Sequence, residues 1–136
     1  MKISTKLLAL GLSASLLGMA TSAIAAPMIE NGTTNYVLCP GEGTSNWNSN
    51  PVNPKDVSFP DNWQYENANI TYNVKEKNNG CYGTKPAEGA ANLHWQEGNV
   101  TTTVTPASGS KVTITMAPAT GCKNQDQSTC YRITVK

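Results

Sequence analysis

Residues 100–116 of this 136-residue chain read VTTTVTPASGSKVTITM, two runs of alternating apolar and polar residues around a short connection from Pro106 to Ser110. Alternation with a period of two is typical of β-strands that rest one face on a core. The apolar members of the two runs can all point inward: Val100, Val104, Val112, Ile114 and Met116. This stretch therefore predicts two β-strands.

The same alternation recurs along most of the chain. A strand is expected near residues 36–39, and ANITYNVK (68–75) places Ile70, Tyr72 and Val74 on one face. NLHWQ (92–96) and the closing CYRITVK (130–136) repeat the pattern; their predicted inward residues are Leu93, Trp95, Tyr131, Ile133 and Val135.

Turn signals separate these runs. Asn79-Gly80 predicts a tight hairpin turn, and Glu97-Gly98-Asn99 predicts a second reversal of the chain. With almost no helical periodicity, about six or seven short strands result. The predicted fold class is all-β: a small antiparallel β-sandwich or barrel, stapled by disulfides.

The first 25 residues have the pattern of a secretory signal peptide. Lys2 and Lys6 precede an apolar run from Leu7 to about Met19, and Ala23-Ile24-Ala25 supplies a cleavage site. The run is shorter than the roughly 20 residues of a membrane span. We expect a bacterial protein exported to the periplasm or the medium, without stable membrane insertion after cleavage.

Residues 26–136 then form one β domain of about 110 residues. Removing Lys2 and Lys6 leaves eight basic and nine acidic residues, a net charge of about −1. Nucleic acid is not an expected partner, because its binding needs a clustered basic face.

The four cysteines fit an exported domain, in which an even number predicts disulfide bonds. Three pairings are open in principle. We favour Cys122–Cys130, because only seven residues separate them, and this leaves Cys39–Cys81. No pair has the two-to-four-residue spacing of a zinc knuckle, so neither a metal nor another cofactor is expected.

The stretch 40–60 is rich in proline and asparagine and predicts a long loop. Loops of this length are usually functional or mobile. Trp47 in its middle has two interpretations: it covers an edge of the core, or it forms a stacking platform or anchor for a partner. The candidate binding residues are Trp47, Trp63 and Trp95.

The inventory for catalysis is small. His94 is the only histidine and is expected at the surface, no G-x-S-x-G motif accompanies it, and Ser108 is a turn serine. Carboxylate pairs for glycoside hydrolysis remain open among Glu42, Glu66, Glu88 and Glu97. We expect the protein not to be an enzyme.

Three stretches, YVLCPG (36–41), GCYG (80–83) and HWQEG (94–98), are similar to parts of the small periplasmic inhibitors of C-type lysozymes. The pattern of that family runs tyrosine-x-x-cysteine, serine-glycine-x-x-tyrosine, then tryptophan-x-lysine-glycine. The resemblance implies inhibition of a lytic enzyme. The chain departs from the pattern where Asn79 replaces the inhibitory serine and Glu97 replaces the inserted lysine.

The function expected from the sequence is therefore binding of an extracytoplasmic protein or glycan through the long loop and exposed aromatic side chains. Inhibition of a lysozyme-type cell-wall lytic enzyme is the first alternative. A small secreted hydrolase and a surface-assembly subunit, which would use an exposed strand edge, are the others.

Overall fold

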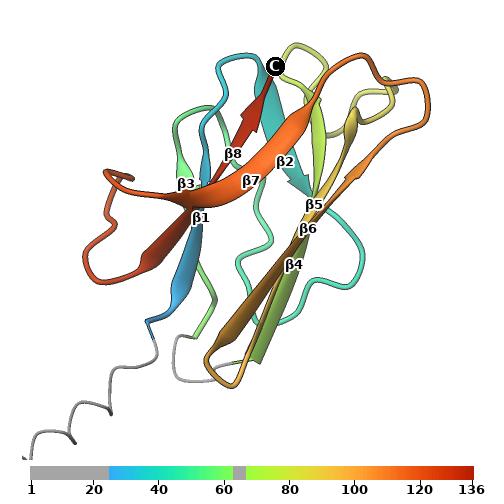
Figure 1. The fold of residues 1–136 in the computed structure, drawn as a ribbon. Coiled ribbons are helices and arrows are strands. Elements are labelled where there is room, and N and C mark those ends of the chain that lie inside the picture. The colour runs from blue at the N-terminus through green and yellow to red at the C-terminus, as the bar shows by residue number, and fades with distance from the viewer. Residues whose placement is uncertain (1–24, 63–66) are drawn as a thin grey trace, which may run out of the picture.

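A computed structural model describes residues 25–62 and 67–136, and these form two four-stranded sheets packed face to face (Figure 1). The first sheet has the order β3-β1-β8-β7, with β3 at Val57–Ser58, β1 at Pro27–Asn31, β8 at Thr129–Val135 and β7 at Ile114–Ala119. The second sheet has the order β2-β4-β5-β6, with β2 at Tyr36–Pro40, β4 at Asn67–Glu76, β5 at Gly89–Gln96 and β6 at Asn99–Pro106. The predicted all-β sandwich is confirmed. No helix in these residues is long and apolar enough to cross a membrane.

The core lies between the sheets, where alternate residues of the second sheet meet the first. In β4, Ile70, Tyr72 and Val74 are fully buried, as predicted, and β5 buries Leu93 and Trp95 beside them. The intervening polar residues of both strands point away from the core. The side-chain period of two thus gives the second sheet one apolar face and one polar outer face.

Residues 97–98 join β5 to β6 as predicted. Glu97 and Gly98 both have positive φ, 53° and 83°, and Gln96 pairs with Asn99 across them. Two consecutive residues with positive φ form a turn whose twist matches that of the flanking strands, which favours a two-residue hairpin.

The tight hairpin predicted at Asn79-Gly80 is wrong. Gly80 has a φ of 63°, but β4 ends at Glu76 and β5 begins only at Gly89, so residues 77–88 form a longer loop. Asn79-Gly80 does lie in a turn, because the N–H of Gly80 donates to the carbonyls of Glu76 and Lys77. The turn ends β4 without starting β5.

Both favoured disulfides are present, Cys39–Cys81 and Cys122–Cys130. The second closes the loop between β7 and β8, and Met116 pairs with Ile133 across these antiparallel strands. The disulfide thus holds the last strand beside the strand that contains Met116. Part of this order was not expected, because β1 pairs in parallel with β8. All five residues of β1 are buried, so its sequence carries no alternation to detect.

The 40–60 loop is anchored to the core and not open. Leu38 and Val52 exchange backbone hydrogen bonds of 3.1 and 2.9 Å, and β3 lies near the end of the stretch. Trp47 is only 2% exposed, and its Nε1 donates to Ser58 Oγ at 2.8 Å. The core interpretation of Trp47 is therefore confirmed, and the exposed platform is wrong.

Ser58 Oγ also accepts the hydroxyl of Tyr72 at 2.6 Å, so one serine satisfies two buried donors from different parts of the fold. Burial raises the pKa of Tyr72 to about 12, and the neighbouring polar groups of Ser58 and Trp47 act in the opposite direction. The phenol is therefore held in its neutral form inside the sandwich.

The Tyr72 phenol predicts a loss of stability in alkali. The folded state holds this proton more tightly than the unfolded chain, whose tyrosine pKa is about 10. The free energy of unfolding should therefore fall as pH rises from about 10 toward 12, by up to about 2–3 kcal/mol from this group. Urea unfolding at a series of alkaline pH values measures the slope for the native chain and for Tyr72→Phe. The native slope should be steeper, and equal slopes would contradict the assignment.

Candidate functional site

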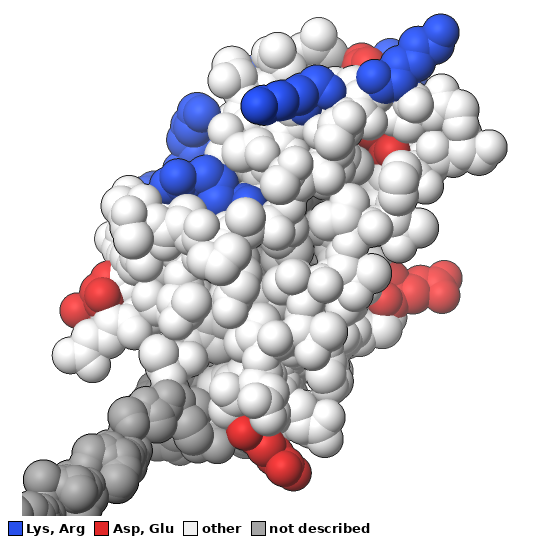
Figure 2. Space-filling view, viewed as in Figure 1, with Lys and Arg blue, Asp and Glu red and all other residues white. Residues whose placement is uncertain are grey.

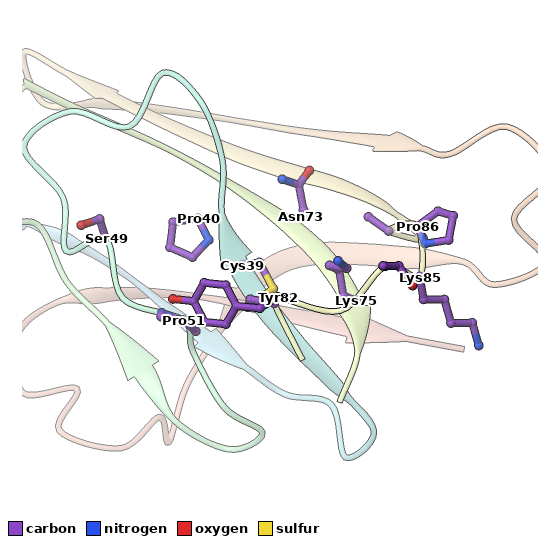
Figure 3. Close-up of a pocket in the computed structure, with 12 residues that line it drawn as sticks. Cys39, Pro40, Ser49, Pro51, Asn73, Lys75, Tyr82, Lys85 and Pro86 are labelled. Atoms are coloured by element: carbon purple, nitrogen blue, oxygen red, sulfur yellow. A yellow bond between two sulfur atoms is a disulfide. The ribbon is translucent and has the colours of Figure 1, made fainter. Parts of the chain in front are cut away.

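A cleft of about 490 Å³ opens on the outer face of the second sheet, at the end where β4 runs into the 77–88 loop. Cys39, Asn73 and Lys75 form its floor, because these residues of β2 and β4 point away from the core. The 77–88 loop supplies one wall with Tyr82 and Lys85, and Ser49 and Pro51 of the long loop supply the other (Figure 3). Four parts of the chain, β2, β4, the 77–88 loop and the long loop, thus meet around one hollow.

The Cys39–Cys81 disulfide fastens the 77–88 loop to this floor. Cys39 pairs with Asn73 in the sheet and points outward, so its bond to Cys81 pulls the loop across the outer face. Lys75 Nζ adds a hydrogen bond of 2.9 Å to the carbonyl of Gly83. The residues on either side of Tyr82 are therefore both held.

Gly83 is required at its position by space. A Cβ added to it would lie 2.4 Å from the backbone oxygen of Asn79, closer than atoms can approach. The loop can fold back on itself only with glycine here. This close packing fixes the direction in which the preceding residue, Tyr82, leaves the backbone.

Tyr82 is 96% exposed and is the one large hydrophobic side chain so exposed in the part of the chain that the structure describes. Single exposed apolar residues are common at protein surfaces. Tyr82 differs from such residues because it stands at the rim of a cleft on a rigid backbone. Tyrosine in this setting offers a large contact area at a small entropic cost.

The charge of the cleft is positive. Its lining includes Lys75 and Lys85 and contains no acidic residue. Lys85 Nζ pairs with Glu76 at 2.7 Å, and its side chain extends away from Tyr82 and Asn73 in Figure 3. Lys75 is therefore the cation that serves the cleft, with one of its three donors used by Gly83.

Basic residues gather more widely at this end of the sandwich. The Lys and Arg side chains visible in Figure 2 lie over the upper part of the view, with acidic side chains among them, where Figure 1 places the 77–88 loop and the C-terminus. Backbone hydrogen bonds from Lys77 to Asn35, and between Thr113 and Lys136, bring several of these segments together. An anionic ligand approaching this end meets a favourable field.

Below the cleft, the outer face of the second sheet is neutral and polar. Asn92 donates to Thr71 Oγ1 at 2.9 Å and to Asn69 Oδ1 at 3.1 Å, and the His94 ring contacts Asn69 and Gln96. These side chains satisfy one another in a fixed network. His94 is a member of this network, which agrees with its predicted place on the polar face.

The predicted binding residues do not meet at the cleft. Trp95 is 1% exposed and points into the core, like Trp47, and Trp63 lies outside the described residues. Trp95 Nε1 is buried without a hydrogen-bond partner among the residues described. Tyr82 was not selected from the sequence, although its position between a disulfide cysteine and a required glycine is the signal that marks it.

The structure separates several of the candidate catalytic groups. Glu88 and Glu97 flank opposite ends of β5, and Ser108 lies in the connection after β6, far along the strand from His94. Glu66 lies outside the described residues. Within residues 25–62 and 67–136, no group of three or more His, Cys, Asp or Glu side chains could hold a metal ion.

Fold and site together define a disulfide-stapled β-sandwich with a basic, tyrosine-rimmed cleft. Comparisons with known protein families, with curated proteins and with solved structures found no match. The stretches similar to lysozyme inhibitors are divided in space: residues 80–83 lie at the cleft end, and residues 96–98 at the far end of β5. The first and last residues of β5 are seven residue steps apart, about 23 Å.

Proposed function

We propose that this chain is an exported, non-enzymatic binding protein whose cleft takes a glycan that carries an acidic group. The observation that carries the proposal is the exposed ring of Tyr82 at the rim of a cleft whose lining includes the Lys75 ammonium group and no carboxylate. The signal-like first 25 residues and the two disulfides support export, because disulfides persist in oxidising compartments.

The chemistry of a sugar ring matches the groups of the cleft. A pyranose has an apolar face that can lie on an aromatic ring. The ring of Tyr82 is exposed, so a ligand can reach it without displacing other side chains. Its hydroxyl groups need donors and acceptors, which the Asn73 amide and the Thr84 hydroxyl supply. A carboxylate or sulfate on the sugar would pair with Lys75.

A glycan fits this site better than a folded protein partner. The cleft is small and its lining is as polar as it is apolar, whereas protein interfaces bury a broad patch with an apolar centre. The surface around the cleft offers one large apolar anchor, Tyr82, among the described residues. The neutral polar face below the cleft would extend the contact for a longer chain of sugars.

The Tyr82 ring is expected to supply much of the binding free energy. Tyr82→Ala should weaken binding by at least about tenfold, while Tyr82→Phe, which keeps the ring, should stay within about threefold of the native affinity. Isothermal titration with uronic-acid-containing oligosaccharides, and with neutral oligosaccharides of the same length, measures both variants. The acidic sugars should bind more tightly, and more weakly as salt is added.

Unfolding curves provide the control, because Tyr82→Ala should leave the free energy of unfolding unchanged at a site this exposed. Equal affinity of the alanine and phenylalanine variants would show that the Tyr82 ring does not contribute to binding. Absence of binding to every acidic and neutral sugar in the panel would contradict the proposal that the ligand is a glycan.

A further inference from the structure

The edges of the two sheets differ in how well they are protected against pairing with another chain. An exposed edge presents unpaired N–H and C=O groups, and native proteins protect such edges with short strands, proline, charges or covering loops. Here β3 has two residues, β7 contains Pro118, and Val52 of the long loop bonds to the edge of β2 at Leu38. The fourth edge, β6, has no such protection between Asn99 and Thr105.

The register of β6 identifies its free groups. Ala107 N–H donates to the Glu88 carbonyl at 3.0 Å, which fixes the odd-numbered residues of β6 as those that bond to β5. The N–H and C=O groups of Val100, Thr102 and Val104 therefore point to the open side. No backbone hydrogen bond of the described residues uses them there. The pairing with β5 runs without a bulge from Gln96–Asn99 to Gly89–Pro106, so this edge is regular.

The side chains of β6 also suit pairing. From Asn99 to Thr105 the strand carries no charge and is mostly β-branched, which favours strand formation. Thr101, Thr102 and Thr103 are exposed in succession, so nothing in the described structure covers the middle of the edge. Proline appears only at the end of the strand, as Pro106.

We propose that β6 pairs antiparallel with β6 of a second copy of this chain, about a two-fold axis through Thr102. In this register Val100 faces Val104 of the second copy and Thr102 faces the second copy's Thr102. Each such pair exchanges both of its N–H···O bonds. Every free backbone group of this edge then has a partner, and Thr101 meets Thr103 as a neutral cross-strand pair.

The absence of charge along β6 is compatible with a second copy as the occupant. Glu97 lies at the hairpin end of β6, and Lys111 lies in the connection beyond the other end. Antiparallel pairing directs the Glu97 end of each copy toward the end of the other that carries Lys111 and also Glu88, whose carboxylate accepts a hydrogen bond from Ser110, so charges of both signs lie at these ends. No like charges face each other along the paired strands.

The geometry places both clefts on one side of the assembly. A two-fold axis that relates antiparallel neighbours in a sheet is perpendicular to the sheet, so the outer faces of both second sheets point the same way. The result is one continuous eight-stranded sheet, to which each copy contributes four strands. Self-association does not depend on the proposed glycan; if that proposal also holds, the dimer binds a sugar polymer at two points.

Sedimentation equilibrium of the purified protein, from the low micromolar to the millimolar range, tests the pairing. The native chain should pass from monomer toward dimer, with modest affinity because one strand edge buries little area. Thr102→Lys and Thr102→Glu should each remain monomeric, since like charges would then face each other on the axis. An equimolar mixture of the two variants should regain the dimer.

Thr115→Lys, an exposed threonine on β7 changed in the same way, should dimerise like the native chain. Unfolding curves of the Thr102 variants should match the native curve, because the side chain is exposed. A native protein that is monomeric over the whole range would overturn the proposal. So would charge variants that dimerise alone, or a mixture that does not.

Discussion

Replacing Cys39 and Cys81 together with alanine is expected to lower the free energy of unfolding by about 4 kcal/mol. The reason is that this disulfide closes a loop of 42 residues in sequence separation, and in the chain-entropy model a longer loop constrains the unfolded chain more. Globular domains are stable by only about 5–15 kcal/mol. The change would therefore remove a large share of the stability of this domain.

The matched control is the Cys122→Ala, Cys130→Ala double variant. Its disulfide spans 8 residues, for which the same model gives about 2.5 kcal/mol. Urea unfolding of both variants without reductant measures the difference. If the shorter disulfide proved the more stabilising, the loop-entropy explanation would fail.

The two double variants should also differ in binding. Loss of Cys39–Cys81 frees the 77–88 loop from the floor of the cleft, so binding of acidic oligosaccharides should weaken even where the domain remains folded. Loss of Cys122–Cys130, which joins the ends of the loop between β7 and β8, should leave binding unchanged.

Trp47→Ala is the single substitution with the largest expected effect on stability, about 3–5 kcal/mol. The side chain is 2% exposed and belongs to the main core cluster, so its removal leaves a cavity between the sheets. It also removes the Nε1 donor that bonds to Ser58. Trp47→Phe, which keeps an aromatic ring but loses this bond, should cost clearly less.

Tyr82→Ala provides the comparison that separates core from surface, because it removes an aromatic side chain that is 96% exposed. Chemical denaturation of the three variants under the same conditions should rank them, from least to most destabilised, as Tyr82→Ala, Trp47→Phe and Trp47→Ala. A Trp47→Ala variant as stable as the native chain would contradict the place of this ring in the core.

Local patterns were sufficient where one residue period decides the structure. The alternation in 68–75 and 92–96 predicted the inward residues of β4 and β5, and Glu97-Gly98 predicted the hairpin, because each depends on neighbouring residues alone. The spacing of Cys122 and Cys130 predicted a disulfide for the same reason.

Two strands were missed because their placement depends on distant partners. β1 is buried along its whole length between β3 and β8, so it lacks a polar face. β3 has two residues, too few to show any period. The sequence therefore predicted about six or seven strands, whereas residues 25–62 and 67–136 form eight.

The candidate site could be predicted only in part. Tryptophan in a polar, proline-rich stretch is compatible with an exposed anchor and with a core residue. For Trp47 the distinction depends on its burial in the core, which the local sequence does not specify. The exposure of Tyr82 follows from Cys81 and Gly83, whose partners Cys39 and Asn79 fix the loop. Cys81 and Gly83 flank Tyr82 in the sequence, but the contacts that give them these roles exist only in the folded chain.

The most direct test of the cleft as the binding site is an NMR titration of the isotope-labelled protein with a uronic-acid-containing oligosaccharide. The account predicts that the backbone amide shifts concentrate at Asn73, Lys75, Tyr82, Thr84 and Lys85, which line the cleft. Shifts that instead concentrate on the β7 and β8 side of the sandwich, or no shifts at a saturating concentration of sugar, would contradict it.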